Sequence, residues 1–393
     1  MKNKTPHTIT GIRKRLIESC SSLFFIYKAI SEYRSIQAAM DVLKKLTRLK
    51  RDVQGNLPVS KMVKANGRYY WNLHVPGFPS KALTANVVGD MNRIHPVRSG
   101  NNRLNMLFLG ITKKCPLQCQ HCYEWDALNK KETLTLSSLK SIVDKFQRSG
   151  VGHIHLLGGE PMARFEEMVE LIRDIKPDTE VWMSTCGFNL TEGKAIILKE
   201  AGLTGVAISL DHFEPGPHNE FRGNPRAFDW ALAATTNCRK AGLITCWSLC
   251  TTREFISHDN LYQYALAAKR NKVNYIQLFE PMPTGRYSGK DVALTPSQIK
   301  ILEDFHREMN TSRNYRDFPL VEYIGQYQRR IGCLGSGNRY LFIDPDGNVQ
   351  SCPFCRTSRK MHAEDQDVDD LIDWIGKEGC QRYKMHASSN YLA

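Results

Sequence analysis

Three closely spaced cysteines are the residues of this sequence best suited to chemistry. Cys115, Cys119 and Cys122 are separated by three and two residues within one short segment. Three thiolates can bind three irons of a four-iron, four-sulfur cluster, which leaves the fourth iron without a protein ligand. Such an iron is open to a small molecule, whereas a cluster closed by four cysteines usually carries electrons only. The spacing therefore favours a reactive iron–sulfur site.

A structural zinc ion is the alternative for the same cysteines, with a fourth ligand such as His121. Zinc sites usually combine two pairs of ligands, each pair closely spaced along the chain. This segment contains one triplet, and no matching pair lies near it. The pattern favours iron and leaves zinc as the competing interpretation.

Composition sets the broad class. The chain has 393 residues, enough for one large α/β domain and a smaller one, and its 41% hydrophobic and 24% charged residues are typical of globular proteins. Its twelve cysteines gather mainly in two places, which suits metal chemistry in a reducing cytoplasm better than disulfides. No stretch reaches the roughly 18 apolar residues that span a bilayer, and no secretory signal is evident. We therefore expect a cytoplasmic protein.

The positive charge is concentrated at the N-terminus. Residues 1–51 hold 12 Lys or Arg and three acidic residues, out of a net charge of +14 for the chain. Apolar residues recur every three or four positions over residues 11–51, which predicts two basic helices. These helices either pack on the main domain or contact an amphiphile or the inner surface of a membrane. Nothing here is patterned like a nucleic-acid-binding motif, so no nucleic-acid partner is expected.

The central part of the chain alternates strand-like and helix-like runs. Such alternation predicts parallel strands with right-handed crossovers, and in parallel barrels the active site lies at the carboxyl ends of the strands. Outside it we expect a strand over 68–75 and helices over 295–330. The predicted strands are 104–111, 153–157, 179–184, 203–209, 243–250 and 273–279, and the helices between them are 135–149, 163–176, 191–202, 225–241 and 256–271.

Polar or glycine-bearing motifs follow the predicted strands directly. The cysteine loop follows the first strand, and paired glycines, which let a backbone approach a ligand closely, follow the second. The later motifs are Met183-Ser184-Thr185-Cys186-Gly187, Ile208-Ser209-Leu210-Asp211 with downstream His218 and Arg222, and Glu280, a weak candidate for a proton acceptor.

The cysteine loop and the Leu157-Gly158-Gly159-Glu160-Pro161 motif together resemble the radical S-adenosylmethionine (SAM) superfamily. The resemblance implies a partial (β/α)6 TIM-like barrel and a four-iron cluster on Cys115, Cys119 and Cys122. It further implies that the open iron chelates SAM, whose reductive cleavage yields a 5′-deoxyadenosyl radical. Relatives often have Asn where this chain has Cys186. The SAM contacts implied are Gly158, Gly159, Glu160, Pro161, Ser184, Ser209 and Arg222.

A second group of cysteines lies near the C-terminus: Cys333, Cys352, Cys355 and Cys380. Between them, residues 339–352 predict a hairpin turning at Pro345-Asp346-Gly347-Asn348. The spacing resembles the auxiliary-cluster module called SPASM or its shortened form, twitch, and implies a second four-iron cluster. A zinc ribbon is the alternative. The predicted division is a basic helical extension (1–101), the barrel (102–290), a helical connector (291–330) and the twitch-like module (331–393).

Three functions fit these features. The first is a radical SAM enzyme that abstracts hydrogen from a peptide or small molecule, leading to crosslinking, oxidation or other C–H functionalisation. The second is a radical SAM enzyme acting on a lipid or other amphiphile at a membrane surface. The third is a zinc or iron–sulfur protein with a structural or redox role. For the enzymes, a flavodoxin- or ferredoxin-like reductant is expected.

Overall fold

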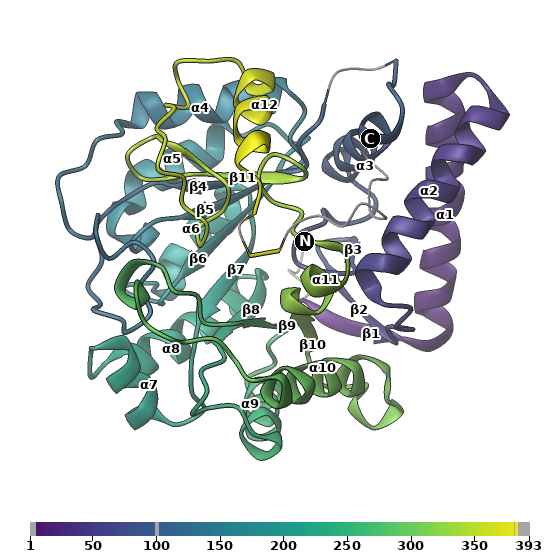
Figure 1. Ribbon diagram of the computed structural model, residues 1–393. Coiled ribbons are helices and arrows are strands. Elements are labelled where there is room, and N and C mark those ends of the chain that lie inside the picture. The colour runs from purple at the N-terminus through teal and green to yellow at the C-terminus, as the bar shows by residue number, and fades with distance from the viewer. Residues whose placement is uncertain (1–4, 99–101, 381, 384–393) are drawn as a thin grey trace.

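A nine-stranded sheet forms the centre of the computed structural model, which describes residues 5–98, 102–380 and 382–383 (Figure 1). Its strand order is β10-β9-β8-β7-β6-β5-β4-β11-β12. Six consecutive strands are parallel, which confirms the predicted partial (β/α)6 barrel. These strands are β4 (Met106–Gly110), β5 (His153–Leu157), β6 (Glu180–Thr185), β7 (Leu203–Ser209), β8 (Ile244–Cys250) and β9 (Tyr275–Phe279).

Helices follow these strands and pack their apolar faces on the sheet. In helix α4 (Leu136–Arg148), the apolar residues recur at helical spacing and are buried in the main core: Leu139, Ile142, Val143 and Phe146. Several helices begin at a hydroxyl residue that accepts a backbone N–H of the first turn, as Thr135 and Ser257 do. The helices are α4 (Leu136–Arg148), α5 (Phe165–Asp174), α6 (Glu192–Ala201), α8 (Ala227–Lys240) and α9 (His258–Arg270), with the additional α7 (Pro215–Arg222).

Three further strands extend the six-stranded sheet at its edges. β10 (Leu320–Tyr323) pairs in parallel with β9, and β11 (Tyr340–Ile343) pairs in parallel with β4 and leads through the predicted hairpin to β12 (Val349–Gln350). The connector is thus not purely helical, because β10 lies between α10 (Pro296–Thr311) and α11 (Ile324–Ile331). A four-residue strand is too short to show a period in the sequence. The last helix of the described residues is α12 (Val368–Glu378).

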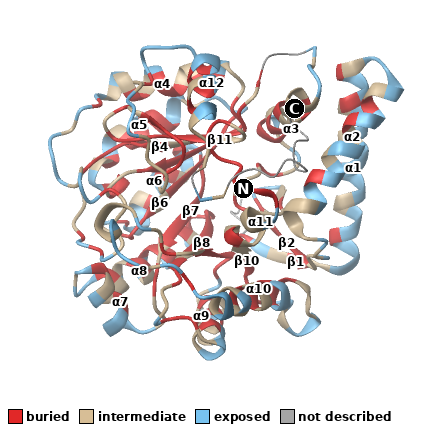
Figure 2. Cartoon of the chain, viewed as in Figure 1, coloured by how far each residue is buried: buried red, intermediate tan, exposed pale blue. Residues whose placement is uncertain are grey.

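The N-terminal segment contains more than the two predicted helices. A small antiparallel sheet joins β1 (His7–Thr10), β2 (Lys61–Ala65) and β3 (Arg68–Tyr70). Helices α1 (Gly11–Tyr33) and α2 (Ile36–Gln54) confirm the predicted pair, whereas β1, β2 and α3 (Lys81–Ile94) were not predicted. Helix α1 lies at the periphery, with much of its surface exposed (Figures 1 and 2).

Lys61 fastens this segment to the connector. Its side chain is fully buried, and its Nζ donates to the carbonyls of Tyr315, Phe318 and Pro319 at 2.8, 2.9 and 2.9 Å. Burial lowers the pKa of this amine to about 7. Within the part of the chain that the structure describes, no helix is long and apolar enough to cross a membrane.

Candidate active site

The cysteine loop leaves the carboxyl end of β4 and is held by its neighbours. Asn129 accepts from the backbone N–H of Cys115 at 3.0 Å and donates to its carbonyl at 3.1 Å. Arg286 donates to the carbonyl of Cys119 at 3.3 Å. A Cβ at Gly285 would lie 2.2 Å from the Cys122 carbonyl oxygen, so only glycine lets this segment approach the loop. These contacts hold the loop at the carboxyl end of β4.

The paired glycines after β5 pack against the segment that leads into the cysteine loop. A Cβ at Gly158 would lie 2.4 Å from the Thr112 carbonyl oxygen, and one at Gly159 would lie 2.4 Å from the Lys114 carbonyl oxygen. The backbone N–H of Gly159 donates to Thr112 at 2.8 Å. The glycines thus bring two strand ends together, a role that the sequence motif alone did not predict.

Glu160 connects this motif to the end of β6. Its buried carboxylate accepts from the Thr185 hydroxyl and from the backbone N–H of Cys186, both at 2.6 Å, and from Met162 N at 3.0 Å. Burial raises the pKa of Glu160 despite these bonds. Pro161 begins a short 3-10 helix. The Glu160 side chain is therefore engaged within the protein, which leaves backbone groups as the motif's available contacts.

Arg222 is buried beside the cysteine loop. Its Nε donates to Asp211 at 2.5 Å, and its Nη1 lies 3.6 Å from Cys119 Sγ. Asp211 also accepts from Cys250 N at 2.9 Å, and its own N–H donates to His218 Nδ1 at 3.0 Å. Burial opposes ionisation of Asp211, but the Arg222 guanidinium outweighs it and lowers the pKa of that carboxyl.

One cavity of about 430 Å³ brings the predicted site residues together. Ser184, whose Oγ lies 2.9 Å from His155 Nε2, and Ser209 belong to its wall. Pro161 is the one predicted residue that does not line it. The lining includes Cys115, Cys119, Cys122, Gly158, Gly159, Glu160, Arg222, Cys333, Cys352, Cys355 and Cys380.

The second cysteine group is compact. The Sγ atoms of Cys355 and Cys380 are 3.9 Å apart, and the backbone N–H of Cys355 donates to Cys352 Sγ at 3.2 Å. Gly335 N donates to Cys333 Sγ at 3.3 Å. Backbone N–H groups directed at sulfur favour the thiolate form, which is the form that binds metal.

The residues present fit a four-iron cluster at each group. Among the described residues, no three His, Cys, Asp or Glu side chains converge closely enough to hold a single metal ion. A four-iron cluster does not need such convergence, because each thiolate binds a different iron. Burial raises the pKa of the Cys115, Cys119 and Cys122 thiols, so these thiolates require a positive partner in the site.

The central part of the chain matches a known protein family. Residues 109–263 match the family model described as the radical SAM superfamily. Residues 109–263 of this chain therefore form a radical SAM domain. Radical SAM proteins are enzymes that bind a four-iron cluster and SAM. The loop that carries Cys115, Cys119 and Cys122 follows β4 at the carboxyl end of the strand, a position that agrees with that chemistry.

The similar proteins act on different substrates. An AdoMet-dependent heme synthase of Oleidesulfovibrio alaskensis is 26% identical over 68% of this chain and 74% of its own length. A PqqA peptide cyclase of Bradyrhizobium diazoefficiens is 26% identical over 71% and 74%. The crystal structure of Streptococcus suis SuiB bound to precursor peptide SuiA has a TM-score of 0.60 at 14% identity, covering 90% of this chain and 82% of SuiB. That structure shows a shared fold.

Several site residues were not identified from the sequence. Asn129 and Arg286 hold the loop through backbone contacts that no motif marks. Asp211 lies in the Ser-Leu-Asp segment, a signal that could have identified it as the partner of Arg222. Glu280, which the sequence suggested as a proton acceptor, forms ion pairs with Arg329 and Arg382.

Proposed function

We propose that this radical SAM enzyme abstracts hydrogen from a peptide substrate bound in the cavity between its two cysteine groups, leading to crosslinking or oxidation. The observation that carries the proposal is that Cys119 and Cys352 line the same cavity. When bound at Cys115, Cys119 and Cys122, the cluster supplies the electron that cleaves SAM to methionine and a 5′-deoxyadenosyl radical. A flavodoxin- or ferredoxin-like protein is the proposed electron donor.

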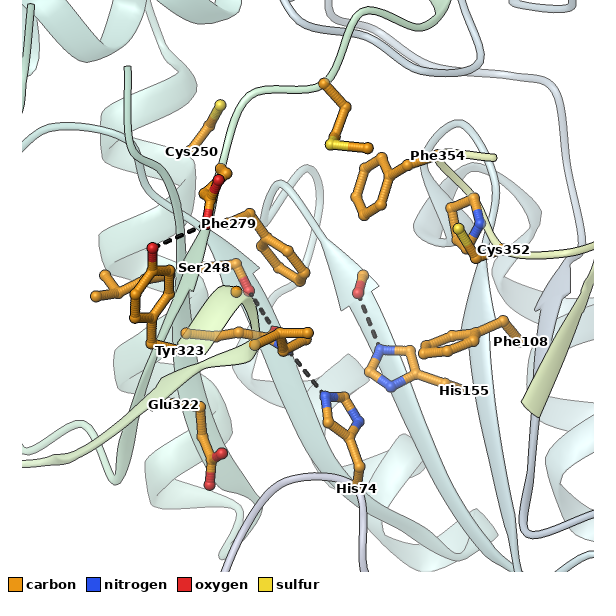
Figure 3. Close-up of a pocket in the computed structure, with 18 of the residues that line it drawn as sticks. His74, Phe108, His155, Ser248, Cys250, Phe279, Glu322, Tyr323, Cys352 and Phe354 are labelled. Carbon is orange, nitrogen blue, oxygen red and sulfur yellow. Dashed lines mark hydrogen bonds between the residues drawn. The ribbon is translucent and has the colours of Figure 1, made fainter. Parts of the chain in front are cut away.

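The chain's own residues have distinct parts in this proposal. Gly158 and Gly159 offer backbone groups to the SAM amino group, while Ser184 and Ser209 offer hydroxyls from the ends of β6 and β7. Arg222 donates a hydrogen bond toward Cys119 and orients the loop. Apolar side chains such as Phe108, Phe279 and Phe354 line the cavity and exclude water from a reactive radical (Figure 3).

The second cysteine group is proposed to hold an auxiliary four-iron cluster on Cys333, Cys352, Cys355 and Cys380. The module is joined to the loop by the Arg356–Glu124 ion pair, and the rings of Tyr123 and Phe354 lie 5.7 Å apart. A cluster so placed can accept the electron left after substrate oxidation.

A peptide substrate is supported by the PqqA peptide cyclase relative and by the fold shared with peptide-bound SuiB. The test is anaerobic reconstitution with iron, sulfide, reductant and SAM, followed by measurement of 5′-deoxyadenosine. Mass spectrometry of peptides encoded near the gene then seeks a loss of hydrogen. The proposal predicts release of 5′-deoxyadenosine by the parent and none by a C115A/C119A/C122A variant. Equal release by both would contradict it.

An amphiphilic substrate is the second candidate, because α1 presents an exposed apolar stripe. Ile12, Leu16, Leu23, Tyr27 and Ile30 are 69, 59, 68, 71 and 38% exposed and recur at helical spacing. They lie in the strongly basic N-terminal segment, a combination that suits anionic membranes. Liposome sedimentation of an L16E/L23E variant tests this candidate, with I196E, an exposed position on α6, as control. Unchanged sedimentation of the double variant would exclude it.

A further inference from the structure

A strip of polar side chains crosses four neighbouring strands of the cavity wall. Glu322 on β10 is in register with Gln277 on β9, Gln277 with Ser248 on β8, and Ser248 with Ser209 on β7. Residues in register project from the same face of a sheet, and all four line the cavity. Glu322 therefore stands at the end of the strip farthest from Ser209.

The middle of the strip uses its polar groups internally. Ser248 Oγ donates to Gln277 Oε1 at 3.4 Å, and Gln277 Nε2 lies 2.9 Å from His74 Nε2. Burial lowers the pKa of His74 to about 4, so this imidazole is neutral. Ser248, Gln277 and neutral His74 therefore provide no positive charge for the Glu322 carboxylate.

Glu322 differs from the other acids that line this cavity. Among the described residues, no Lys, Arg or His forms an ion pair with its carboxyl, which accepts from the backbone N–H of Leu73. Glu280, one residue beyond β9, is by contrast paired with Arg329 and Arg382. Burial raises the pKa of Glu322 to about 8. The side chain is half-buried because it faces the cavity.

A carboxyl that has no cationic partner among the described residues is complementary to a cation in the cavity that it lines. A neutral donor would add one hydrogen bond, whereas an ammonium or guanidinium adds a charge-assisted hydrogen bond and stabilises the ionised form of the carboxyl. We propose that Glu322 binds a positively charged nitrogen group of the substrate, an ammonium or a guanidinium. The inference rests on the proposed function, because it assumes that a substrate enters this cavity.

The position of Glu322 makes it an anchor for the substrate. Three strand spacings separate it from Ser209, roughly 14 Å along the sheet. An extended peptide covers that distance with about four residues. The cation held by Glu322 therefore lies away from the carbon that reacts near SAM, and Glu322 selects which segment of the substrate enters.

Calorimetric binding of small probes to the anaerobically reconstituted full-length protein tests this anchor. The probes are n-pentylammonium, n-pentylguanidinium, 1-hexanol and pentanoate, which share size and apolar tail. The parent should bind at least one cation more tightly than hexanol or pentanoate, and the tighter cation identifies the substrate group. The E322Q variant should lose about tenfold or more in cation affinity while keeping its affinity for hexanol.

E308Q, a change at an exposed position on α10, serves as the matched control and should bind like the parent. Three outcomes would each contradict cation binding by Glu322. They are equal cation affinity in the parent and E322Q, equal binding of pentanoate and the cations, and no saturable binding of either cation. Failure of the proposed function is distinct, because it would appear as absence of 5′-deoxyadenosine from the parent whatever the probes do.

Discussion

Arg222 Nη1 lies 3.6 Å from Cys119 Sγ while its Nε donates to Asp211 at 2.5 Å. One guanidinium thus contacts a cysteine of the loop and a buried carboxylate at the same time. The Asp211–Arg222 pair lies almost entirely out of solvent, and breaking such a pair costs far more than removing both partners.

We expect R222M to lower the free energy of unfolding by about 3–5 kcal/mol, because it leaves Asp211 buried without its cation. The D211N/R222M double variant should recover much of that loss. Denaturant unfolding of the parent, the D211N and R222M single variants and the double variant gives the double-mutant cycle that measures this coupling. Additive effects of the two single changes would show that the pair is not coupled.

Separate cluster sites predict separate losses of iron. The parent should carry roughly eight irons per chain, and a C115A/C119A/C122A variant or a C333A/C352A/C355A variant roughly four. Iron analysis after anaerobic reconstitution measures this directly. Zinc in either group, or loss of all iron from the second variant alone, would contradict the assignment.

The glycine at 159 is expected to be intolerant of a methyl group. A Cβ there would lie 2.4 Å from a backbone oxygen of the cysteine-loop segment, so G159A should cost about 1–3 kcal/mol of stability and lower iron retention. G193A on α6, where an added Cβ meets nothing within 4 Å, is the control and should be neutral or stabilising. A G159A protein as stable as the parent would show that the loop can move aside.

We expect the E322Q substitution to increase the free energy of unfolding by an amount that depends on pH. Its pKa rises from 4.5 to about 8 on folding, so the folded state disfavours ionisation. The cost is absent below pH 4.5, grows as pH rises and is complete above about pH 8. E322Q should therefore be more stable than the parent by about 2–4 kcal/mol near pH 8 and nearly equal near pH 4.5. A difference that does not grow with pH would contradict the raised pKa.

Sequence periodicity was sufficient for the barrel, because its strands and helices alternate over runs long enough to show their period. The short strands β1, β2 and β10 were missed, since their pairing depends on distant residues. The cysteines were identified by spacing. Glu322 could not be identified in this way, because its distinctive property is that no cation among the described residues pairs with it, in a cavity that exists only after folding.

The buried amine of Lys61 couples the unfolding of the N-terminal segment to that of the barrel. Its three carbonyl partners lie about 250 residues away in sequence, so the N-terminal segment cannot separate from the connector without breaking all three bonds. The segment and the barrel should therefore melt in a single cooperative transition, as one folding unit.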